Sequence, residues 1–169
     1  DPAKVSAMTS WLAPTCVKGL RGFLGLTGYY RQFIRQYGVL ASPLTALLKK
    51  GAFSWTVEAE DSFDRLNQAM VTAPILLLPD FTLPFVVETD ASDTGLGVVL
   101  LQQDRPVAFF SKSLSGRSLQ LSAYEKEMMA IVHAVTKWRP YLLGRRFTIR
   151  TDHQPLKYFL EQRVSTPAQ

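Results

Sequence analysis

The spacing of apolar residues changes once along the chain, and the order of elements after that change limits the folds open to it. Alternation over 85–90 predicts a β-strand, and two further strands are predicted over 98–102 and 107–111. Their short connections favour an antiparallel meander. A long helix over 122–142 then leads to a fourth strand over 147–152. Because a helical crossover joins parallel strands, the fourth strand is predicted to pair in parallel with one of the first three.

The long helix is predicted to bury one apolar stripe against this sheet. Helical spacing selects the members of that stripe, which are Tyr124, Met128, Ile131, Val135, Trp138 and Leu142. Beyond the fourth strand, Pro155 suits the first position of a closing helix over 156–162. The second half of the chain is therefore predicted to be an α/β domain with a mixed sheet.

The first half is predicted to be a small all-helical unit over 14–74. Apolar residues at helical spacing predict one helix over 17–34, with Thr15 as its N-cap, and a second over 40–49. Thr56 is the predicted N-cap of a third helix. The buried stripe predicted for this third helix consists of Ala59, Phe63, Leu66 and Met70.

Composition excludes several classes of protein. The single cysteine, Cys16, excludes an internal disulfide and a thiolate zinc site, and it fits a reducing, intracellular compartment. No apolar run approaches the roughly 18 residues of a membrane span, so no membrane partner is expected. A cytoplasmic particle and the nucleus both stay open. The net charge of +5 is spread over both halves, and it fits a phosphate-bearing partner as well as an ordinary solvated basic surface.

Three carboxylates are predicted to meet at one edge of the sheet. Asp90 and Asp152 each end a strand, and Glu125 lies in the first turn of the long helix. If the fourth strand pairs beside the first, the two aspartates become neighbours and the helix brings Glu125 toward them. Oxygen ligands suit Mg²⁺ or Mn²⁺, and two such ions about 4 Å apart can drive phosphodiester hydrolysis. The alternative is that these residues are ordinary turn, cap and surface carboxylates.

Residues near the aspartates have two interpretations each. Glu88 and Arg150 each precede an aspartate by two positions, and we expect them to form a cross-strand ion pair separated by less than about 6 Å. Ser92 is small enough for a nucleic-acid backbone to approach, and it serves equally well in a turn. His153 is a candidate for contact with a phosphate or for a role at a helix start.

Basic side chains of the helical half are candidates for contacts with a nucleic-acid backbone. Arg21, Arg31 and Arg35 lie around a Tyr29–Tyr30 pair, and Lys49–Lys50 follows the second predicted helix. The alternative interpretation is an amphipathic helix with a charged outer face.

Several motifs, in order, resemble one family of polyproteins. Thr89-Asp90-Ala91-Ser92, Tyr124-Glu125-Lys126-Glu127 and Thr151-Asp152-His153 resemble the ribonuclease H domain of gypsy-type LTR retrotransposon Pol polyproteins. The run from Leu20 to Arg31, LRGFLGLTGYYR, resembles the thumb of the same family's reverse transcriptase. Residues 1–5 and Trp11 resemble the stretch that leaves its palm.

This resemblance implies a layout and an activity. Residues 1–13 would leave the palm, 14–74 would form the thumb, and 75–169 would form a ribonuclease H-like domain that lacks its last strand and helix. Asp90, Glu125 and Asp152 would be three of four carboxylates that bind two Mg²⁺ or Mn²⁺ ions and cut the RNA strand of an RNA–DNA hybrid.

The resemblance also implies partners and limits. The thumb would hold template–primer during RNA-directed DNA synthesis, alongside the rest of the Pol polyprotein. Both ends look like cuts through a longer polypeptide. Because the fragment lacks the fourth carboxylate, it is expected to be inactive or only weakly active on its own. The alternative is a non-catalytic nucleic-acid-binding remnant of a truncated or domesticated retroelement.

Overall fold

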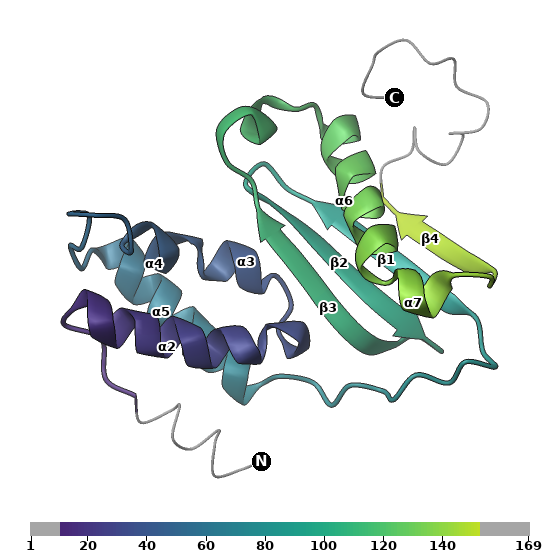
Figure 1. The fold of residues 1–169 in the computed structure, drawn as a ribbon, viewed down its shortest axis with the longest axis horizontal. Coiled ribbons are helices and arrows are strands. Elements are labelled where there is room, and N and C mark those ends of the chain that lie inside the picture. The colour runs from purple at the N-terminus through teal and green to yellow at the C-terminus, as the bar shows by residue number, and fades with distance from the viewer. Residues whose placement is uncertain (1–10, 153–169) are drawn as a thin grey trace.

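The chain folds into a helical unit followed by a four-stranded sheet (Figure 1). The computed structural model describes residues 11–152. His153 and the predicted closing helix over 156–162 lie outside the described residues. None of the described helices is long and apolar enough to cross a membrane.

The helical unit contains five helical segments packed around a main apolar cluster and a smaller one at Ile34 and Met70. They are α2 (Val17–Tyr29), η1 (Arg31–Phe33), α3 (Tyr37–Leu40), α4 (Ser42–Ala46) and α5 (Val57–Val71). Leu20, Phe23, Leu44, Phe63 and Leu66 form the centre of its core.

Two of the three predicted helices differ from the structure in their extent, and the third is confirmed. The helix predicted over 17–34 ends at Tyr29 and gives way to η1. Within the range 40–49, where one helix was predicted, the structure has the last residue of α3 and the short helix α4. Thr15 is not the N-cap of α2, because Cys16 holds that position and makes no side-chain capping bond. Thr56 caps α5 as predicted, by accepting a hydrogen bond from the Ala59 amide at 3.3 Å.

The sheet has the predicted mixed topology. Its strands are β1 (Phe85–Ala91), β2 (Gly95–Gln102), β3 (Arg105–Ser113) and β4 (Phe147–Thr151), in the order β3-β2-β1-β4. β2 pairs antiparallel with both β1 and β3, and β4 pairs parallel with β1. The crossover between β3 and β4 passes through η2 (Gly116–Gln120), α6 (Ala123–Lys137) and α7 (Arg139–Leu142).

The face that α6 buries differs from the predicted stripe. Trp138 and Leu142 are buried as predicted, whereas the other four members of the stripe are only partly buried. The buried positions of α6 are Lys126, Glu127, Ala130 and Ala134. Two alanines let the helix backbone lie close to the sheet, so the larger apolar side chains flank the contact instead of filling it. The helix also breaks at Trp138, because Pro140 cannot donate the backbone bond that a continuous helix needs.

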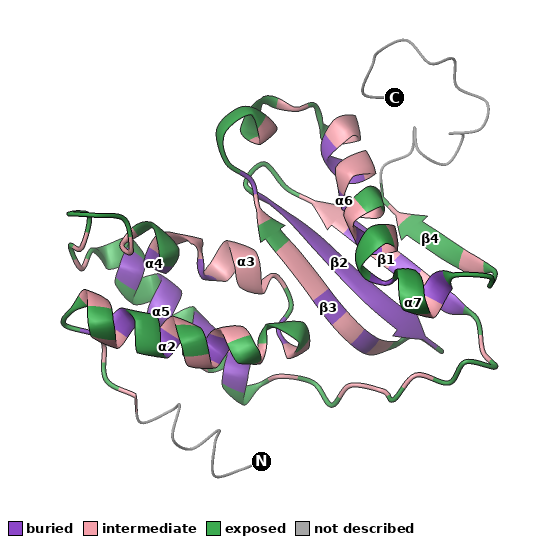
Figure 2. Cartoon of the chain, viewed as in Figure 1, coloured by how far each residue is buried: buried purple, intermediate pink, exposed green. Residues whose placement is uncertain are grey.

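Strand β2 is buried along its whole length, which shows that both faces of the sheet are covered (Figure 2). On the α6 side, Phe85 and Val87 of β1 pack in the same cluster as Ala130 and Ala134. On the other side, Val99, Leu101 and Phe109 form a cluster that packs against Leu76, in the segment between α5 and β1. A strand that is buried on both faces typically has a continuous apolar sequence, and β2 has such a sequence.

The helical unit docks directly on the sheet near the end of β3. The Gly38 amide donates a 2.6 Å hydrogen bond to the Ser111 hydroxyl. Gly95 leaves room for Val39, since a Cβ atom at Gly95 would lie 2.2 Å from Val39 Cγ2. This close approach joins the two units into one packed body.

We therefore expect Gly95→Ala to weaken the docking of the helical unit. The added methyl group meets a β-branched side chain with little freedom to move, so the loss of stability should be about 1–3 kcal/mol. Gly25→Ala is the matched control, because a Cβ at Gly25 meets nothing within 4 Å inside α2 and should stabilise the helix by up to about 1 kcal/mol. Denaturant unfolding of both variants checks the contrast, and equal effects would contradict it.

Candidate functional site

The parallel pairing of β1 and β4 places two aspartates at one edge of the sheet. The last paired residues are Thr89 and Thr151, and each is followed directly by an aspartate, Asp90 or Asp152. Asp90 is partly buried, while Asp152 is exposed immediately after β4. The two aspartates therefore end neighbouring strands, so the condition on which the predicted aspartate pair depended is met.

A buried glutamate from α6 joins the ends of these strands. Glu127 is 3% exposed, and its Oε2 accepts hydrogen bonds from the hydroxyls of Thr89 at 2.9 Å and Thr151 at 3.3 Å. Its Oε1 accepts a 2.6 Å bond from the Ala91 amide. Three donors compensate for the cost of burying the carboxylate. All three donors come from residues adjacent in sequence to Asp90 or Asp152, so Glu127 is the carboxylate that the helix delivers to this edge.

Glu125 has a different task in the structure. Its Oε2 accepts bonds from the Ser122 amide at 2.9 Å and the Ser122 hydroxyl at 2.8 Å, and its own amide donates to that hydroxyl at 3.2 Å. These reciprocal bonds are a capping box at the start of α6. They hold the pKa of the Glu125 carboxyl below its usual value, with the bond from the Ser122 amide as the largest cause.

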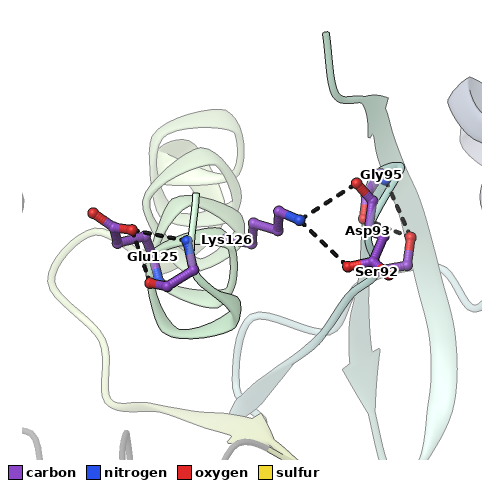
Figure 3. Close-up of polar contacts among 6 residues, drawn as sticks. Ser92, Asp93, Gly95, Glu125 and Lys126 are labelled. Atoms are coloured by element: carbon purple, nitrogen blue, oxygen red, sulfur yellow. Dashed lines mark hydrogen bonds and ion pairs between the residues drawn. The ribbon is translucent and has the colours of Figure 1, made fainter. Parts of the chain in front are cut away.

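The structure therefore does not bring Glu125 to the two aspartates. Figure 3 shows Glu125 on the side of α6 away from the side chain of Lys126, and its carboxylate is bonded to Ser122. The Ser-x-x-Glu spacing of Ser122 and Glu125 is itself a sequence signal for a capping box. That signal assigns Glu125 a capping role, but which carboxylate reaches the aspartates depends on how α6 lies on the sheet.

Lys126 ties α6 to the turn that follows Asp90. Its side chain is buried, and its Nζ atom lies 3.4 Å from the Asp93 carbonyl oxygen and 3.5 Å from Asp93 Oδ1 (Figure 3). In the same turn, the Ser92 hydroxyl accepts a bond from the Gly95 amide and donates one to the Gly95 carbonyl, both at 3.1 Å. Ser92 thus closes a turn, the second of its two predicted roles.

The predicted cross-strand ion pair is confirmed. Glu88 and Arg150 are register partners, and Arg150 Nη1 lies 3.3 Å from Glu88 Oε2. Arg150 Nη2 also lies 3.2 Å from Asp104 Oδ1, a partner in the β2–β3 turn that sequence spacing did not indicate. The bonds to Asp104 and Glu88 raise the pKa of the Arg150 guanidinium. Because the pair is exposed to solvent, it should contribute little to the free energy of unfolding, and its main effect is to favour this register of β4 against β1.

The expected group of three converging carboxylates is not seen in the part of the chain that the structure describes. Within residues 11–152, no three histidine, cysteine, aspartate or glutamate side chains converge closely enough to hold a metal ion. The arrangement at the edge is instead two strand-end aspartates with the buried Glu127 bonded to their neighbours.

The basic candidates of the helical unit lie at its surface. Arg21, Arg31 and Arg35 are exposed, as are Lys49 and Lys50. Arg31 lines a cleft of about 530 Å³ between the helical unit, β3 and the end of α6. Arg35 lies in a small depression with Glu88 and Asp90, on the sheet face that the helical unit contacts.

The sequence of the chain is similar to that of a known family of domains and to longer polyproteins. The model of the family described as an RNase H-like domain found in reverse transcriptase matches residues 55–149. The chain is 48% identical over 160 residues to the retrovirus-related Pol polyprotein from transposon 297 of Drosophila melanogaster, covering 94% of the chain and 15% of that relative. It is 37% identical to the corresponding polyprotein from transposon gypsy of the same organism, covering 96% of the chain and 17% of the relative. The chain thus spans less than a fifth of each relative.

Solved structures show the same fold. A foamy viral protease–reverse transcriptase in complex with double-stranded DNA superimposes with a TM-score of 0.84 at 20% identity, covering 97% of this chain and 36% of that one. The same kind of enzyme in complex with an RNA/DNA hybrid gives a TM-score of 0.81 at 21% identity, covering 99% of this chain and 24% of that one.

The capping box supports a prediction about pH. Ser122→Ala should destabilise the protein by about 1 kcal/mol at neutral pH, because the start of α6 loses its cap. The pKa of Glu125 is lowered in the folded state, so its contribution is present above the unfolded value of about 4.3 and is lost as pH falls through the folded pKa. The difference between wild type and variant should therefore shrink below about pH 4.

Urea unfolding at a series of pH values checks this expectation. Ser115→Ala is the matched control, because Ser115 begins η2 without a side-chain capping bond. A difference between wild type and Ser122→Ala that stays constant from neutral to acid pH would contradict the assigned role of Glu125.

Proposed function

The chain belongs to the family of RNase H-like domains found in reverse transcriptases, in its gypsy-type retrotransposon Pol form, and we propose that, within its polyprotein, it takes part in cleavage of the RNA strand of RNA–DNA hybrids. The observation that carries the proposal is the bonding of buried Glu127 to the neighbours of Asp90 and Asp152. Three separate elements, β1, α6 and β4, thereby bring acidic residues to one edge of the sheet.

We propose Asp90, Glu127 and Asp152 as the metal-binding carboxylates, with Glu127 in place of Glu125. The donor set is carboxylate oxygen throughout, which fits Mg²⁺ or Mn²⁺ and does not fit a thiolate-bound metal. When bound, such ions polarise a phosphodiester and activate water for attack on phosphorus. A divalent cation would also offset the mutual repulsion of acidic residues at one sheet edge.

The residues around these carboxylates would position them. Thr89, Thr151 and the Ala91 amide orient Glu127 through hydrogen bonds, and such partners of ligating groups strongly affect metal affinity. Lys126 holds the turn after Asp90 against α6. The ion pair of Arg150 with Glu88 keeps β4 in register with β1, two residues before each aspartate.

We propose that the helical unit holds template–primer through phosphate contacts. Its exposed arginines, Arg21, Arg31 and Arg35, can neutralise phosphates without reading sequence. Two of the structural neighbours were solved in complex with double-stranded DNA and with an RNA/DNA hybrid, which supports a nucleic-acid partner. The rest of a Pol polyprotein would supply the other steps of RNA-directed DNA synthesis.

The second candidate function is a non-catalytic nucleic-acid-binding remnant. It is favoured by the absence, within the described residues, of three acidic side chains that already converge on a metal position. The two candidates differ in one measurable property, which is Mg²⁺-dependent hydrolysis.

The nuclease proposal predicts that Glu127→Gln and Glu125→Gln behave differently. Loss of a residue that hydrogen-bonds to a metal ligand typically lowers metal affinity or activity by 10–100-fold. Loss of the proposed ligand Glu127 itself should therefore lower the rate of hybrid cleavage by more than about 100-fold. Glu125→Gln should retain activity within about threefold, since a glutamine can still take part in a capping box. The assay uses labelled hybrid with Mg²⁺ or chelator, on this chain and on the chain within its polyprotein.

Each outcome of this assay selects one interpretation. Loss of activity in Glu125→Gln with full activity in Glu127→Gln would restore the assignment made from sequence. If the wild-type chain binds hybrid without Mg²⁺-dependent cleavage, both alone and within its polyprotein, the non-catalytic interpretation holds.

Binding of hybrid should also depend steeply on salt. Each neutralised phosphate contributes a slope of about −0.9 to the logarithm of affinity against the logarithm of salt concentration. Arg31→Ala should reduce the magnitude of that slope by about 0.9, whatever the sequence of the hybrid. Fluorescence anisotropy at several salt concentrations measures the slope, and an affinity that is flat with salt would rule out phosphate contacts as the basis of binding.

A further inference from the structure

The structure assigns Gln36, a residue of the helical unit, as a positioning residue for the Asp90 carboxylate. Gln36 Nε2 donates a 3.2 Å hydrogen bond to Asp90 Oδ2 across 54 residues of sequence. The inference rests on the proposed function, because it takes Asp90 to be a metal ligand. It adds that the helical unit takes part in building the nuclease site.

Gln36 is held in a backbone conformation that glutamine seldom adopts. Its φ of 55° and ψ of 26° lie in the left-handed region, where a side chain with a Cβ atom is unfavourable. Such a conformation persists only where surrounding contacts enforce it. It turns the chain between η1 and α3 so that the Gln36 side chain faces the sheet.

Contacts on the C-terminal side of Gln36 fix this turn against the sheet. The Tyr37 hydroxyl is hydrogen-bonded to Thr27 of α2 at 3.0 Å, and the Gly38 amide is bonded to Ser111 of β3 at 2.6 Å. Val39 fills the space that Gly95 leaves. Gln36 is therefore presented to Asp90 by a rigid connection.

The sheet is shaped to accept the Gln36 side chain. Gly97 is the register partner of Asp90, and a Cβ atom at Gly97 would lie 3.5 Å from Gln36 Cγ. Alternation along β1 turns Asp90 to the face opposite α6, whereas the Thr89 side chain faces α6 and bonds Glu127. The edge is thus contacted from both sides, by Gln36 and by Glu127.

The chemistry of an amide suits this task. The Gln36 amide nitrogen only donates, so it can orient Asp90 through Oδ2 and leave Oδ1 free to bind a cation. It carries no charge, so it adds nothing to the positive charge of Arg35, which lines the same depression as Asp90. Carboxylates that bind metals are commonly held by such outer hydrogen bonds, whose loss lowers affinity by 10–100-fold.

The first test measures Mn²⁺ affinity by calorimetry in two variants of the full chain. Gln36→Met keeps the length of the side chain and the left-handed backbone but removes the donor. Gln36→Gly removes the donor and also relieves the backbone. Both should weaken Mn²⁺ binding by about 10–100-fold, because both lose the hydrogen bond to Asp90.

Gln103 provides the matched control. It also has a positive φ, 51°, but it is exposed in the β2–β3 turn. Gln103→Met and Gln103→Gly should leave Mn²⁺ affinity unchanged. If Gln36→Gly binds Mn²⁺ like wild type while Gln36→Met does not, backbone strain explains the effect and the positioning role is overturned.

A second test needs no metal. A double-mutant cycle of Gln36→Met and Asp90→Ala in urea unfolding should show coupling of about fivefold in the unfolding equilibrium constant. Absence of coupling would overturn the inference by itself. Failure of the wild-type chain to bind Mn²⁺, or undiminished binding in Asp90→Ala, would overturn the metal role proposed for Asp90 and the inference with it.

Discussion

The parallel pairing of β1 with β4 is the constraint on which the rest of the site depends. It sets Thr89 beside Thr151 and Glu88 beside Arg150, so each aspartate follows a residue whose partner on the neighbouring strand is known. The buried Glu127 carboxylate accepts hydrogen bonds from both threonines and so bridges the two strands from α6. A shift of one residue in this register would turn the side chains of β4 to the opposite face and separate the donors from Glu127.

The two faces of the sheet contribute different things to this edge. On one face, α6 packs through alanines and places Glu127 and Lys126 against the ends of β1 and its following turn. On the other face, the helical unit seats Gln36 beside Asp90. Coverage on both faces explains why β2, between them, is buried throughout. The acidic edge and the helical unit are consequently parts of one packed structure.

Sequence patterns predicted the larger features well, for identifiable reasons. Alternation and element order predicted that the fourth strand pairs in parallel with one of the first three, and the structure shows that its partner is β1. Given that pairing, the two-residue offset before each aspartate predicted the Glu88–Arg150 pair. The long helix was the weak point. Hydrophobic spacing favoured its large apolar residues as the buried stripe, whereas the sheet selected Ala130 and Ala134, because a close approach leaves room only for small side chains. Glu125 was chosen for a different reason, its place in the first turn of the helix, where the structure uses it in a capping box.

The sequence by itself determined the family, the order of strands and helices, and the acidic character of the sheet edge, since these follow from periodicity and from motifs read locally. Only the tertiary structure decided which glutamate reaches that edge. Glu125 and Glu127 are two residues apart on a helix, about 200° around its axis, so their roles depend on how α6 is rotated against the sheet. Gln36 likewise meets Asp90 only because two units pack together, and no local pattern records a contact between residues so distant in the chain.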